Sequence, residues 1–544
     1  MKKFFKKILT KRLRWILRGY RTLKKEHSQG KIYELMHAIV RTRFQKDNVY
    51  SRIIFGAAEK DAELVVRQYL IARTIVGINF SKSLLYTCGK EGAWVTHPLP
   101  PEWRKIVRQH GFKIPKLWAT FVWNSYVVLL FTQGLLSIWK RFFESVKTIR
   151  SPSENVLKPF VFFCGLTAGN TPQRSNGVRS YDIISWYGQW SGRIKEINAL
   201  CHDVKNLPSS VIEEIPVTYM PLAIPPFTRF TQLIRYMGWS IAATGLSIID
   251  LFRGRWWHAL LLKEASLAAL ARMQRSQNLA RDYLFHNSNW AYRPLWTYEA
   301  IEQGSKITFY FYSTTCGDGF KRSQGYPPPY FGYSAMNWPY YLVWNDHQAA
   351  SLSKIVGKSA NISVVGPIWF QSSVTSMPKL PLNSVAVFDV QPVRDGFYKS
   401  FGIDFDYYTP HTAIQFLSDV YDALVSSNCR FILKRKRNID RLAHPKYRQF
   451  IKELDKLPGF TSIEPDIAAI ELIKNSIAVI SMPFTSTAVI GRELGKPSVY
   501  YDPHGLIQKD DRGAHGIDIL CGLQELHAWV STITNSERMN EEIF

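Results

Sequence analysis

Three adjacent hydroxyl side chains make one short stretch of this sequence chemically distinctive. Thr485, Ser486 and Thr487 lie in ISMPFTSTAVIGRELGKPSVYYDP (residues 480–503), between an apolar run that ends at Ser481 and a helical pattern. Hydroxyls and the backbone N–H groups of a helix start are donors suited to phosphate or carboxylate oxygens. The alternative is an ordinary helix cap, for which one hydroxyl is enough. The stretch predicts an anion site where a strand meets a helix.

A burst of positive charge follows another apolar run. Lys434, Arg435, Lys436 and Arg437 are consecutive in FILKRKRNIDRLAHPKY (residues 431–447). A solvated basic loop is the alternative interpretation. Four cations at one strand end exceed what solubility needs, and cations hold phosphate through charge-assisted hydrogen bonds. Together with the hydroxyls, they predict a site for the phosphate of a nucleotide.

Further polar side chains close neighbouring apolar runs. Asp389 and Gln391 end SVAVFDVQP, and Asp502 ends SVYYDP. In open parallel sheets, ligands bind at the carboxyl ends of the strands. We therefore expect these three side chains to contact donor or acceptor, although an aspartate before proline is also a common turn former.

The elements that must position these side chains alternate between strand and helix. From Asn383 onward the patterns predict strand, helix, strand, helix, strand, helix and strand. This order is typical of a parallel doubly wound domain. A similar alternation begins at PFVFFCG (residues 159–165). Two such Rossmann-like domains facing a cleft make the GT-B architecture of many glycosyltransferases, so we predict an α/β, GT-B-like fold.

Composition divides the chain into three predicted regions. Residues 1–155 are basic and mostly helical, and we expect them to associate with a membrane. Residues 156–380 are expected to form an acceptor domain, and residues 381–544 a nucleotide-sugar donor domain. SPSEN (residues 151–155) serves as the linker between the first two.

The positive charge is concentrated at the amino terminus. The net charge is +26, and residues 1–50 hold fifteen Lys or Arg against three Asp or Glu. In residues 1–25 apolar side chains recur at helical spacing among eleven basic ones, the pattern of a helix that lies on an anionic membrane surface. A solvated tail or a nucleic-acid arm is the alternative. Six scattered cysteines without metal spacing favour a reduced, cytosolic setting.

A second segment that could contact a membrane is residues 117–139, LWATFVWNSYVVLLFTQGLLSIW. The segment carries no charge and is long enough to cross a bilayer. A spanning helix, a hairpin that dips into one leaflet and a buried core helix all fit this pattern. We expect a peripheral protein at the cytoplasmic face of a bacterial inner membrane.

The stretch SMPFTSTAVIGRELGKPSVYYDP resembles the carboxy-terminal signature of bacterial surface-polysaccharide transferases, which are similar to GT-B sialyltransferases and Kdo transferases. Those enzymes use CMP-activated keto-sugar acids. The resemblance implies that Ser486 and Thr487 hold the nucleotide phosphate, and that His444-Pro445 corresponds to a His-Pro motif for the nucleotide. It covers the last 160 residues or so, only the general layout of the middle domain, and none of the first 155.

One departure from that family concerns the His-Pro motif. The relatives carry it at the strand end, where this chain has Lys434-Arg435-Lys436. Either the basic cluster has taken over the phosphate, or His444 returns to it on a loop. We favour the cluster, with Lys434 and Lys436 on the phosphate, and keep His444 as the second candidate.

The resemblance also implies a general base from an acidic residue of the amino-terminal lobe. Asp318, in Gly317-Asp318-Gly319 after the strand KITFYFYS, is the first candidate, because glycines let a sugar approach closely. A glycine-rich turn is the alternative. Asp346, in VWNDHQ, is a weaker second candidate.

The sequence favours an inverting glycosyl transfer to a membrane-bound glycan over three other functions. Asp404-Phe405-Asp406 matches the metal-binding pattern of GT-A transferases but stands alone, so we expect neither a metal nor a cofactor. A teichoic-acid type CDP-polyol phosphotransferase would need a histidine pair, which the sequence does not place convincingly. A membrane scaffold or nucleic-acid binder would explain the charge only, and we expect no nucleic acid partner.

Overall fold

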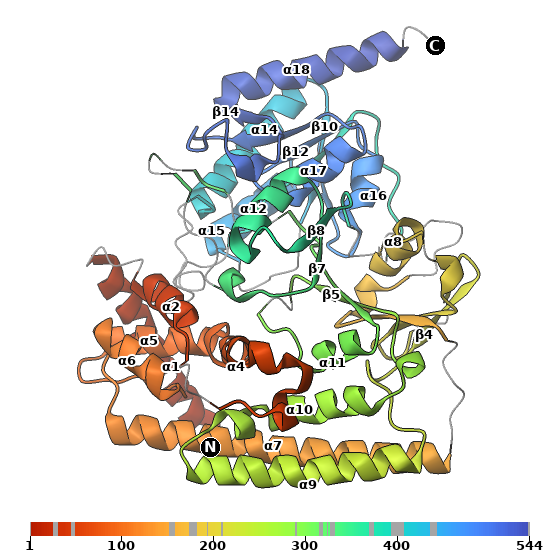
Figure 1. The fold of residues 1–544 in the computed structure, drawn as a ribbon. Coiled ribbons are helices and arrows are strands. Elements are labelled where there is room, and N and C mark those ends of the chain that lie inside the picture. The colour runs from red at the N-terminus through yellow and green to blue at the C-terminus, as the bar shows by residue number, and fades with distance from the viewer. Residues whose placement is uncertain are drawn as a thin grey trace.

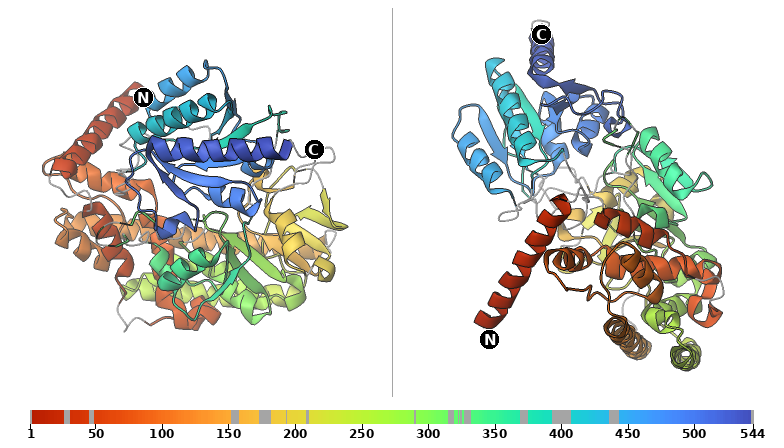
Figure 2. Two further views of the ribbon diagram at one scale, coloured as in Figure 1. Left: turned by 90° about the horizontal axis from the view of Figure 1, so that it is seen from above. Right: turned by 90° about the vertical axis from the view of Figure 1, so that its left-hand side faces the viewer.

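Two parallel β-sheets, each covered by helices, form the two lobes of the molecule in this computed structural model (Figure 1). The amino-terminal helices lie against the first of these lobes, and the second contains the carboxyl terminus. Figure 2 shows the lobes from two further directions. The structure describes residues 2–25, 31–44, 49–151, 158–172, 182–192, 194–207, 210–288, 291–314, 319–321, 323, 325–326, 332–368, 375–392, 407–435 and 443–541.

The middle lobe contains a sheet of eight strands in the order β3-β4-β2-β1-β5-β6-β7-β8. Every neighbouring pair is parallel except β3 and β4. The strands are β1 (Phe160–Phe163), β2 (Ala199–His202), β3 (Ser210–Ile212), β4 (Ile215–Tyr219), β5 (Asp282–His286), β6 (Lys306–Tyr310), β7 (Tyr340–Val343) and β8 (Asn361–Val364). The helices are α8 (Ile183–Trp190), α9 (Phe230–Phe252), α10 (Trp257–Met273), α11 (Trp296–Glu302) and α12 (Asp346–Val356).

Both faces of this sheet are covered, which explains why its central strand is apolar throughout. In β1 all four residues are buried. Phe160 and Phe162 belong to a core shared with the helices, whereas Val161 and Phe163 belong to a core that continues into the other lobe. Successive side chains of a strand point to opposite faces, so a strand buried on both sides has no polar alternation.

The carboxy-terminal lobe has six parallel strands in the order β11-β10-β9-β12-β13-β14. Counted along the lobe this is 3-2-1-4-5-6, the order of a dinucleotide-binding doubly wound sheet. The strands are β9 (Ser384–Phe388), β10 (Arg430–Lys434), β11 (Phe460–Ile463), β12 (Ala478–Ser481), β13 (Ser498–Asp502) and β14 (Ile519–Cys521). The helices are α14 (Pro410–Ser426), α15 (Pro445–Leu454), α16 (Ala469–Lys474), α17 (Ser486–Glu493) and α18 (Gly522–Glu541).

The amino-terminal region is helical, as its sequence predicts, but it is not packed as a separate unit. Its helices share one hydrophobic core with a face of the middle sheet. A change of secondary structure, not a break in packing, therefore marks the predicted boundary at residue 155. The helices are α1 (Lys2–Lys25), α2 (Lys31–Arg41), α3 (Arg52–Phe55), α4 (Ala62–Leu70), α5 (Ile78–Gly89), α6 (Pro101–Gln109) and α7 (Lys116–Arg150).

Short single-turn helices complete the structure. They are η1 (Gly56–Asp61), η2 (Ile71–Ile75), η3 (Ala168–Asn170), η4 (Ile194–Glu196), η5 (Ser276–Asn278), η6 (Tyr333–Ala335) and η9 (Arg512–Ala514). Among the described residues α7 is the one helix whose length and composition would suffice to cross a membrane. A third of its most apolar window is buried inside the protein, so α7 packs against the protein on one side without being enclosed by it.

Candidate active site

The switch point of the carboxy-terminal sheet, where a ligand crevice is expected, lies between β9 and β12. Strand order reverses there, because β10 follows on one side of β9 and β13 on the other side of β12. Ligands of doubly wound sheets bind outside the carboxyl ends of the strands at such a point. The chain leaves β9 at Asp389 and β12 at Met482, and the Met482 N–H donates to the Phe388 carbonyl at 2.8 Å.

The hydroxyl-rich turn follows β12 and is fixed from several sides. Phe484 has φ of 64°, a left-handed conformation that side-chain-bearing residues seldom adopt. The Tyr408 hydroxyl donates to the Pro483 carbonyl at 2.9 Å, and the Tyr500 hydroxyl donates to the Thr485 carbonyl at 2.7 Å. Backbone held in such a conformation by surrounding contacts is common at ligand sites.

Two of the three predicted hydroxyls, those of Thr485 and Thr487, lie together with the hydroxyl of Ser481, whereas the Ser486 hydroxyl contacts Thr314 of the middle lobe. The Thr487 oxygen lies 2.9 Å from the Ser481 oxygen and 3.2 Å from the Thr485 oxygen. Thr485 is the N-cap residue of α17, yet its side chain donates to the Met482 carbonyl and makes no cap hydrogen bond. The ordinary-cap alternative therefore does not describe Thr485, and the first turn of α17 keeps its N–H groups directed toward this edge of the sheet.

Asp389 occupies the other side of the crevice. Its carboxylate is buried and accepts a hydrogen bond from the Tyr447 hydroxyl, while Oδ1 has no hydrogen-bond partner. Burial raises the pKa of Asp389 to about 6, opposed by Tyr447, its own backbone N–H and Arg435. A buried carboxylate with an unmet acceptor and a pKa near neutrality is a group that ligand sites commonly contain.

The residues of the basic cluster differ in their surroundings. Lys434 is buried at the end of β10, and its Nζ donates to the carbonyls of Arg435 and Pro465 at 3.2 Å each. Burial lowers its pKa to about 8. Lys436 lies outside the described residues. β10 is also not the neighbour of β12, because β9 runs between them.

His444 lies beside the segment that follows β9, and residues 436–442, which precede it, are outside the described residues. Its backbone N–H donates to the carbonyl of Pro392, just after β9, at 2.9 Å, and it immediately precedes α15. The same helix carries Tyr447, which binds Asp389. The His444 Nδ1 and the Arg448 Nε are buried without hydrogen-bond partners, and so is the Nε of Arg435 at the end of β10. The sequence did not identify Tyr447 or Arg448 as site residues. The order of apolar and polar residues in α15 does not show which face of this helix meets β9.

Asp502, which the sequence suggested as a substrate contact, is not exposed to the crevice as such a contact would be. It is fully buried and accepts hydrogen bonds from the Tyr407 hydroxyl at 3.0 Å and from the backbone N–H groups of His504 and Ile507 at 3.1 and 2.7 Å. It therefore organises the loop after β13. Gln391 forms a side-chain hydrogen bond with Tyr447. Burial and then Asp389 raise the pKa of Tyr447, while Arg435 and Gln391 act in the opposite direction.

Of the two candidate bases, Asp318 falls outside the described residues. Asp346 is exposed in the first turn of α12, directly after the N-cap Asn345. Asn345 Oδ1 and His515 Nδ1 are 2.9 Å apart, so the start of α12 contacts the carboxy-terminal lobe. Asp346 thus stands at the boundary between the lobes.

The middle lobe has a switch point of its own, between β1 and β5. His286 ends β5, and its Nε2 lies 3.1 Å from the Gly165 carbonyl. Burial lowers the pKa of His286, while Gly165 and Asp203 act in the opposite direction. This histidine was missed because the strand DYLFH was not recognised in the sequence. Its position after an apolar run was the available signal.

Histidines also meet at two other places near the crevice. The rings of His411 and His504 stack at a centroid distance of 5.1 Å, at the start of α14 and the end of β13. His347 and His515 have centroids 5.9 Å apart across the lobes. Among the described residues, no group of three or more His, Cys, Asp or Glu is arranged to hold a metal ion. Asp404 and Asp406 lie outside that part of the chain.

The fold and the site define a two-lobed α/β protein of the GT-B class, with a crevice at the carboxyl edge of its second sheet. A family model, "Polysaccharide biosynthesis PFTS motif protein", matches residues 239–530, more than half of the chain. The chain belongs to this family. The four letters of the motif occur at Pro483-Phe484-Thr485-Ser486, in the turn after β12. No curated protein sequence matches this one.

Solved structures with a similar arrangement are remote in sequence. One is a UDP-GlcNAc 2-epimerase from Methanocaldococcus jannaschii, 10% identical, with a TM-score of 0.36 over 69% of this chain and 92% of the other. The glycotransferase of kitacinnamycin is 8% identical, with a TM-score of 0.33 over 70% and 92%. A heptosyltransferase from E. coli with ADP is 13% identical, with a TM-score of 0.27 over 70% and 99%. These scores are low, and the assignment of architecture rests on the strand order.

Proposed function

We propose that this protein is a glycosyltransferase of bacterial surface-polysaccharide biosynthesis, which transfers a keto-sugar acid from a CMP-activated donor to a membrane-bound glycan. Family membership and the two-lobed fold support the transferase class. One observation carries the location of the donor site. Among the residues that the structure describes, the buried Asp389 Oδ1, Arg435 Nε, His444 Nδ1 and Arg448 Nε have no hydrogen-bond partner, and these residues follow β9 and β10 or begin α15. Buried polar atoms are rarely left unpaired unless a ligand or ion completes them.

The chemistry expected at this edge is an inverting, metal-independent displacement. A carboxylate of the middle lobe, Asp318 or Asp346, removes the proton from the acceptor hydroxyl. The oxygen then forms a bond to the anomeric carbon as the bond from that carbon to the phosphate oxygen breaks. The departing CMP carries the negative charge. Ser486, Thr487 and the first turn of α17 stabilise that charge by hydrogen bonds.

Cations supply the rest of the phosphate site. Arg435 Nε and His444 Nδ1 have no hydrogen-bond partner in the part of the chain that the structure describes, so both are open to a ligand. Lys434 serves instead to fasten the ends of β10 and β11 through two carbonyls. A charged guanidinium is suited to phosphate because its donors form a planar fork.

We place the reaction at the cytoplasmic face of the inner membrane. The basic helix α1 is the proposed contact with anionic lipid, through residues 1–25. A protein held there would meet a lipid-linked acceptor by diffusion in two dimensions.

The deciding experiment is a donor screen with the purified full chain. It measures nucleotide release and product formation with CMP-Kdo, CMP-nonulosonates, CDP-glycerol and UDP-sugars, and calorimetry with CMP, CDP and UDP. Release of CMP with transfer of a sugar acid is the expected result. Absence of cytidine nucleotide binding at millimolar concentration would overturn the donor assignment.

A second candidate function has one observation in its favour. The stacked His411–His504 pair beside Asp502 is the kind of histidine pair that a CDP-polyol phosphotransferase of the teichoic-acid type would use. CDP-glycerol turnover that is lost in both His411→Ala and His504→Ala would select it over sugar transfer.

A further inference from the structure

The long helix α7 has two apolar faces, and the protein covers one of them. The covered face packs against α10, where Gly134 permits close approach, because a Cβ there would lie 2.7 Å from the Leu262 Cβ. The hydroxyls of Ser137 and Ser266 are 2.8 Å apart at the same contact. The opposite face exposes large apolar side chains, namely Leu117, Trp118, Phe121, Val128, Leu129, Leu136, Trp139 and Phe143.

Helix α9 repeats this arrangement beside α7. It buries one face, including Tyr236, Trp239 and Ala243, and exposes Phe230, Ile234, Ile241, Ile248, Ile249 and Phe252. Figures 1 and 2 show α7 and α9 side by side along the edge of the molecule that lies away from the carboxy-terminal lobe. We call the exposed apolar residues of these two helices the apolar platform. Apolar patches of this kind mark surfaces that bind a partner or a membrane.

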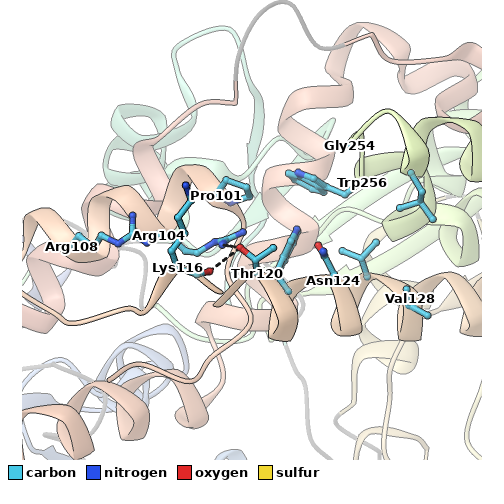
Figure 3. A pocket seen from close by; sticks show the side chains of 12 residues that line it. Pro101, Arg104, Arg108, Lys116, Thr120, Asn124, Val128, Gly254 and Trp256 are labelled. Carbon is cyan, nitrogen blue, oxygen red and sulfur yellow. Dashed lines mark hydrogen bonds between the residues drawn. The ribbon is translucent and has the colours of Figure 1, made fainter. Parts of the chain in front are cut away.

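A cavity of about 560 Å³ lies at one end of the apolar platform (Figure 3). Helix α6, the start of α7 and the turn between α9 and α10 form its walls. Trp123 and Trp256 contribute aromatic surface. The polar side chains that line it are Arg104, Arg108, Lys116, Thr120 and Asn124. Three cations and no carboxylate therefore line this cavity.

Arg104 is the best placed of the cations to bind an anion. Its side chain is buried, with 7% of its surface exposed, and its Nη1 donates to the Thr120 hydroxyl at 2.9 Å. Its Nε is buried and has no hydrogen-bond partner among the residues that the structure describes. Burial and then Arg108 lower the pKa of Arg104, and Glu102 acts in the opposite direction. Arg104 forms no ion pair with any residue that the structure describes. A buried cation without an ion pair is costly, and an anionic ligand that binds Arg104 would compensate its charge.

Two protruding apolar side chains flank the cavity. Leu117, next to the lining residue Lys116, is 87% exposed, and Phe252, next to the lining residue Leu251, is 89% exposed. A cationic cavity with an apolar rim matches a ligand that joins a negative group to hydrocarbon. Such ligands are the anionic lipids of a bilayer.

We propose that this cavity binds the phosphate of an anionic lipid headgroup while the apolar platform, with Leu117 and Phe252 foremost, lies in the same leaflet. The inference rests on the proposed membrane association and not on the proposed transfer chemistry. It makes α7 an in-plane helix, which neither crosses the bilayer nor is buried in the protein on all sides.

Vesicle sedimentation with the purified full chain tests the proposal. The probes are vesicles of phosphatidylcholine alone and of phosphatidylcholine mixed with phosphatidylglycerol. Arg104→Gln with Lys116→Gln should lower affinity for the anionic vesicles by about tenfold or more, given the contribution of each basic residue near a charged surface. The matched control is Lys105→Gln with Lys113→Gln, two exposed lysines of the same region that do not line the cavity. An equal loss in the control would mean diffuse attraction and would overturn the cavity assignment.

Two further arms keep the result decisive. Asn124→Trp fills the cavity without changing charge and should also remove the preference for anionic vesicles, even if the Arg104 variant fails to fold. Leu117→Ser with Phe252→Ser should weaken binding to both kinds of vesicle. Inorganic phosphate, compared with sodium chloride at equal ionic strength, should not displace the protein; displacement would assign the cavity to a soluble phosphate and overturn the lipid. Nucleotide release in detergent, which needs no vesicle, reports separately on the proposed transferase function.

Discussion

The hydroxyl oxygen of Ser486 accepts a hydrogen bond from the backbone nitrogen of Thr314 at 3.0 Å, across the boundary between the two lobes. The two hydroxyl oxygens of this pair are 3.2 Å apart. Beside them the ring of Phe320 meets Phe484 edge-on at a centroid distance of 4.8 Å. The turn proposed to hold the nucleotide phosphate therefore also joins the lobes, and a change at Ser486 should affect both tasks.

The first prediction concerns this turn. Ser486→Ala combined with Thr487→Ala should lower transfer by about 100-fold or more, because charge stabilisation by such donors is lost. Stability should also fall, by about 1 kcal/mol for each lost hydrogen bond, because Ser486 binds Thr314 and Thr487 binds Ser481 and Thr485. The backbone of the turn keeps its contacts with Tyr408 and Tyr500, so the protein should still fold. Initial rates and urea unfolding measure the two effects. Ser531→Ala, an exposed hydroxyl that binds only its own helix, is the control. Unchanged turnover in the double variant would remove the site assignment.

The second prediction concerns the pH dependence of stability at Asp389. Its folded pKa of about 6 lies above the usual 3.8, so the carboxyl stabilises the fold fully below pH 3.8 and this stability is lost as the pH rises through 6. The loss amounts to roughly 3 kcal/mol. Asp389→Asn should flatten the free energy of unfolding between these pH values, as measured by urea titration. Asp422→Asn, at an exposed position, should leave the slope intact.

The third prediction is that Lys434 contributes to the pH dependence of stability and not to phosphate binding. Burial lowers its pKa from 10.5 to about 8, so the neutral amine is favoured in the fold and stability is lost as the pH falls from above 10.5 through 8. Lys434→Met should abolish this slope, which is worth roughly 3 kcal/mol. Binding of CMP should change by less than about twofold, since the Nζ faces two carbonyls. A strong loss of CMP affinity would show that Lys434 binds the phosphate after all.

The fourth prediction concerns His444. His444→Ala should weaken binding of CMP by about tenfold, the loss of one hydrogen bond to a charged group. Calorimetry with CMP and CDP measures it. Lys446→Ala, exposed in the first turn of the same helix, removes a charge that faces solvent and should have little effect. Equal effects of the two substitutions would point to general electrostatic attraction instead of a specific contact.

Four of the six strands of the carboxy-terminal lobe were accessible to sequence reasoning, whereas β11 and β14 were not predicted. SVAVF, CRFILK, IAVIS and SVYYD are apolar runs between helical patterns, and the structure has β9, β10, β12 and β13 there. Short apolar strands buried on both faces leave a local signal that does not depend on their partners. In the middle lobe the same logic missed β2 and β5, whose sequences ALCH and DYLFH end in a polar residue.

The order of strands could not be obtained in that way. The hydroxyl turn and the basic cluster follow β12 and β10, but β9 separates these strands. Pairing between strands distant in sequence depends on the packing of whole lobes, because loop lengths allow several orders. The direction of Lys434 depends on the same packing, since its carbonyl partner Pro465 follows the next strand over.

By itself, the sequence determined the alternation of strand and helix, the hydroxyl-rich turn after Ser481 and the amphipathic nature of the amino-terminal helices, because each is set by neighbours along the chain. Tertiary structure alone decided that Tyr447 binds Asp389, that Ser486 meets Thr314 and that α7 keeps one apolar face outside the core. Those relations join residues far apart in the chain, and their energies arise only when burial and strand pairing bring the lobes together.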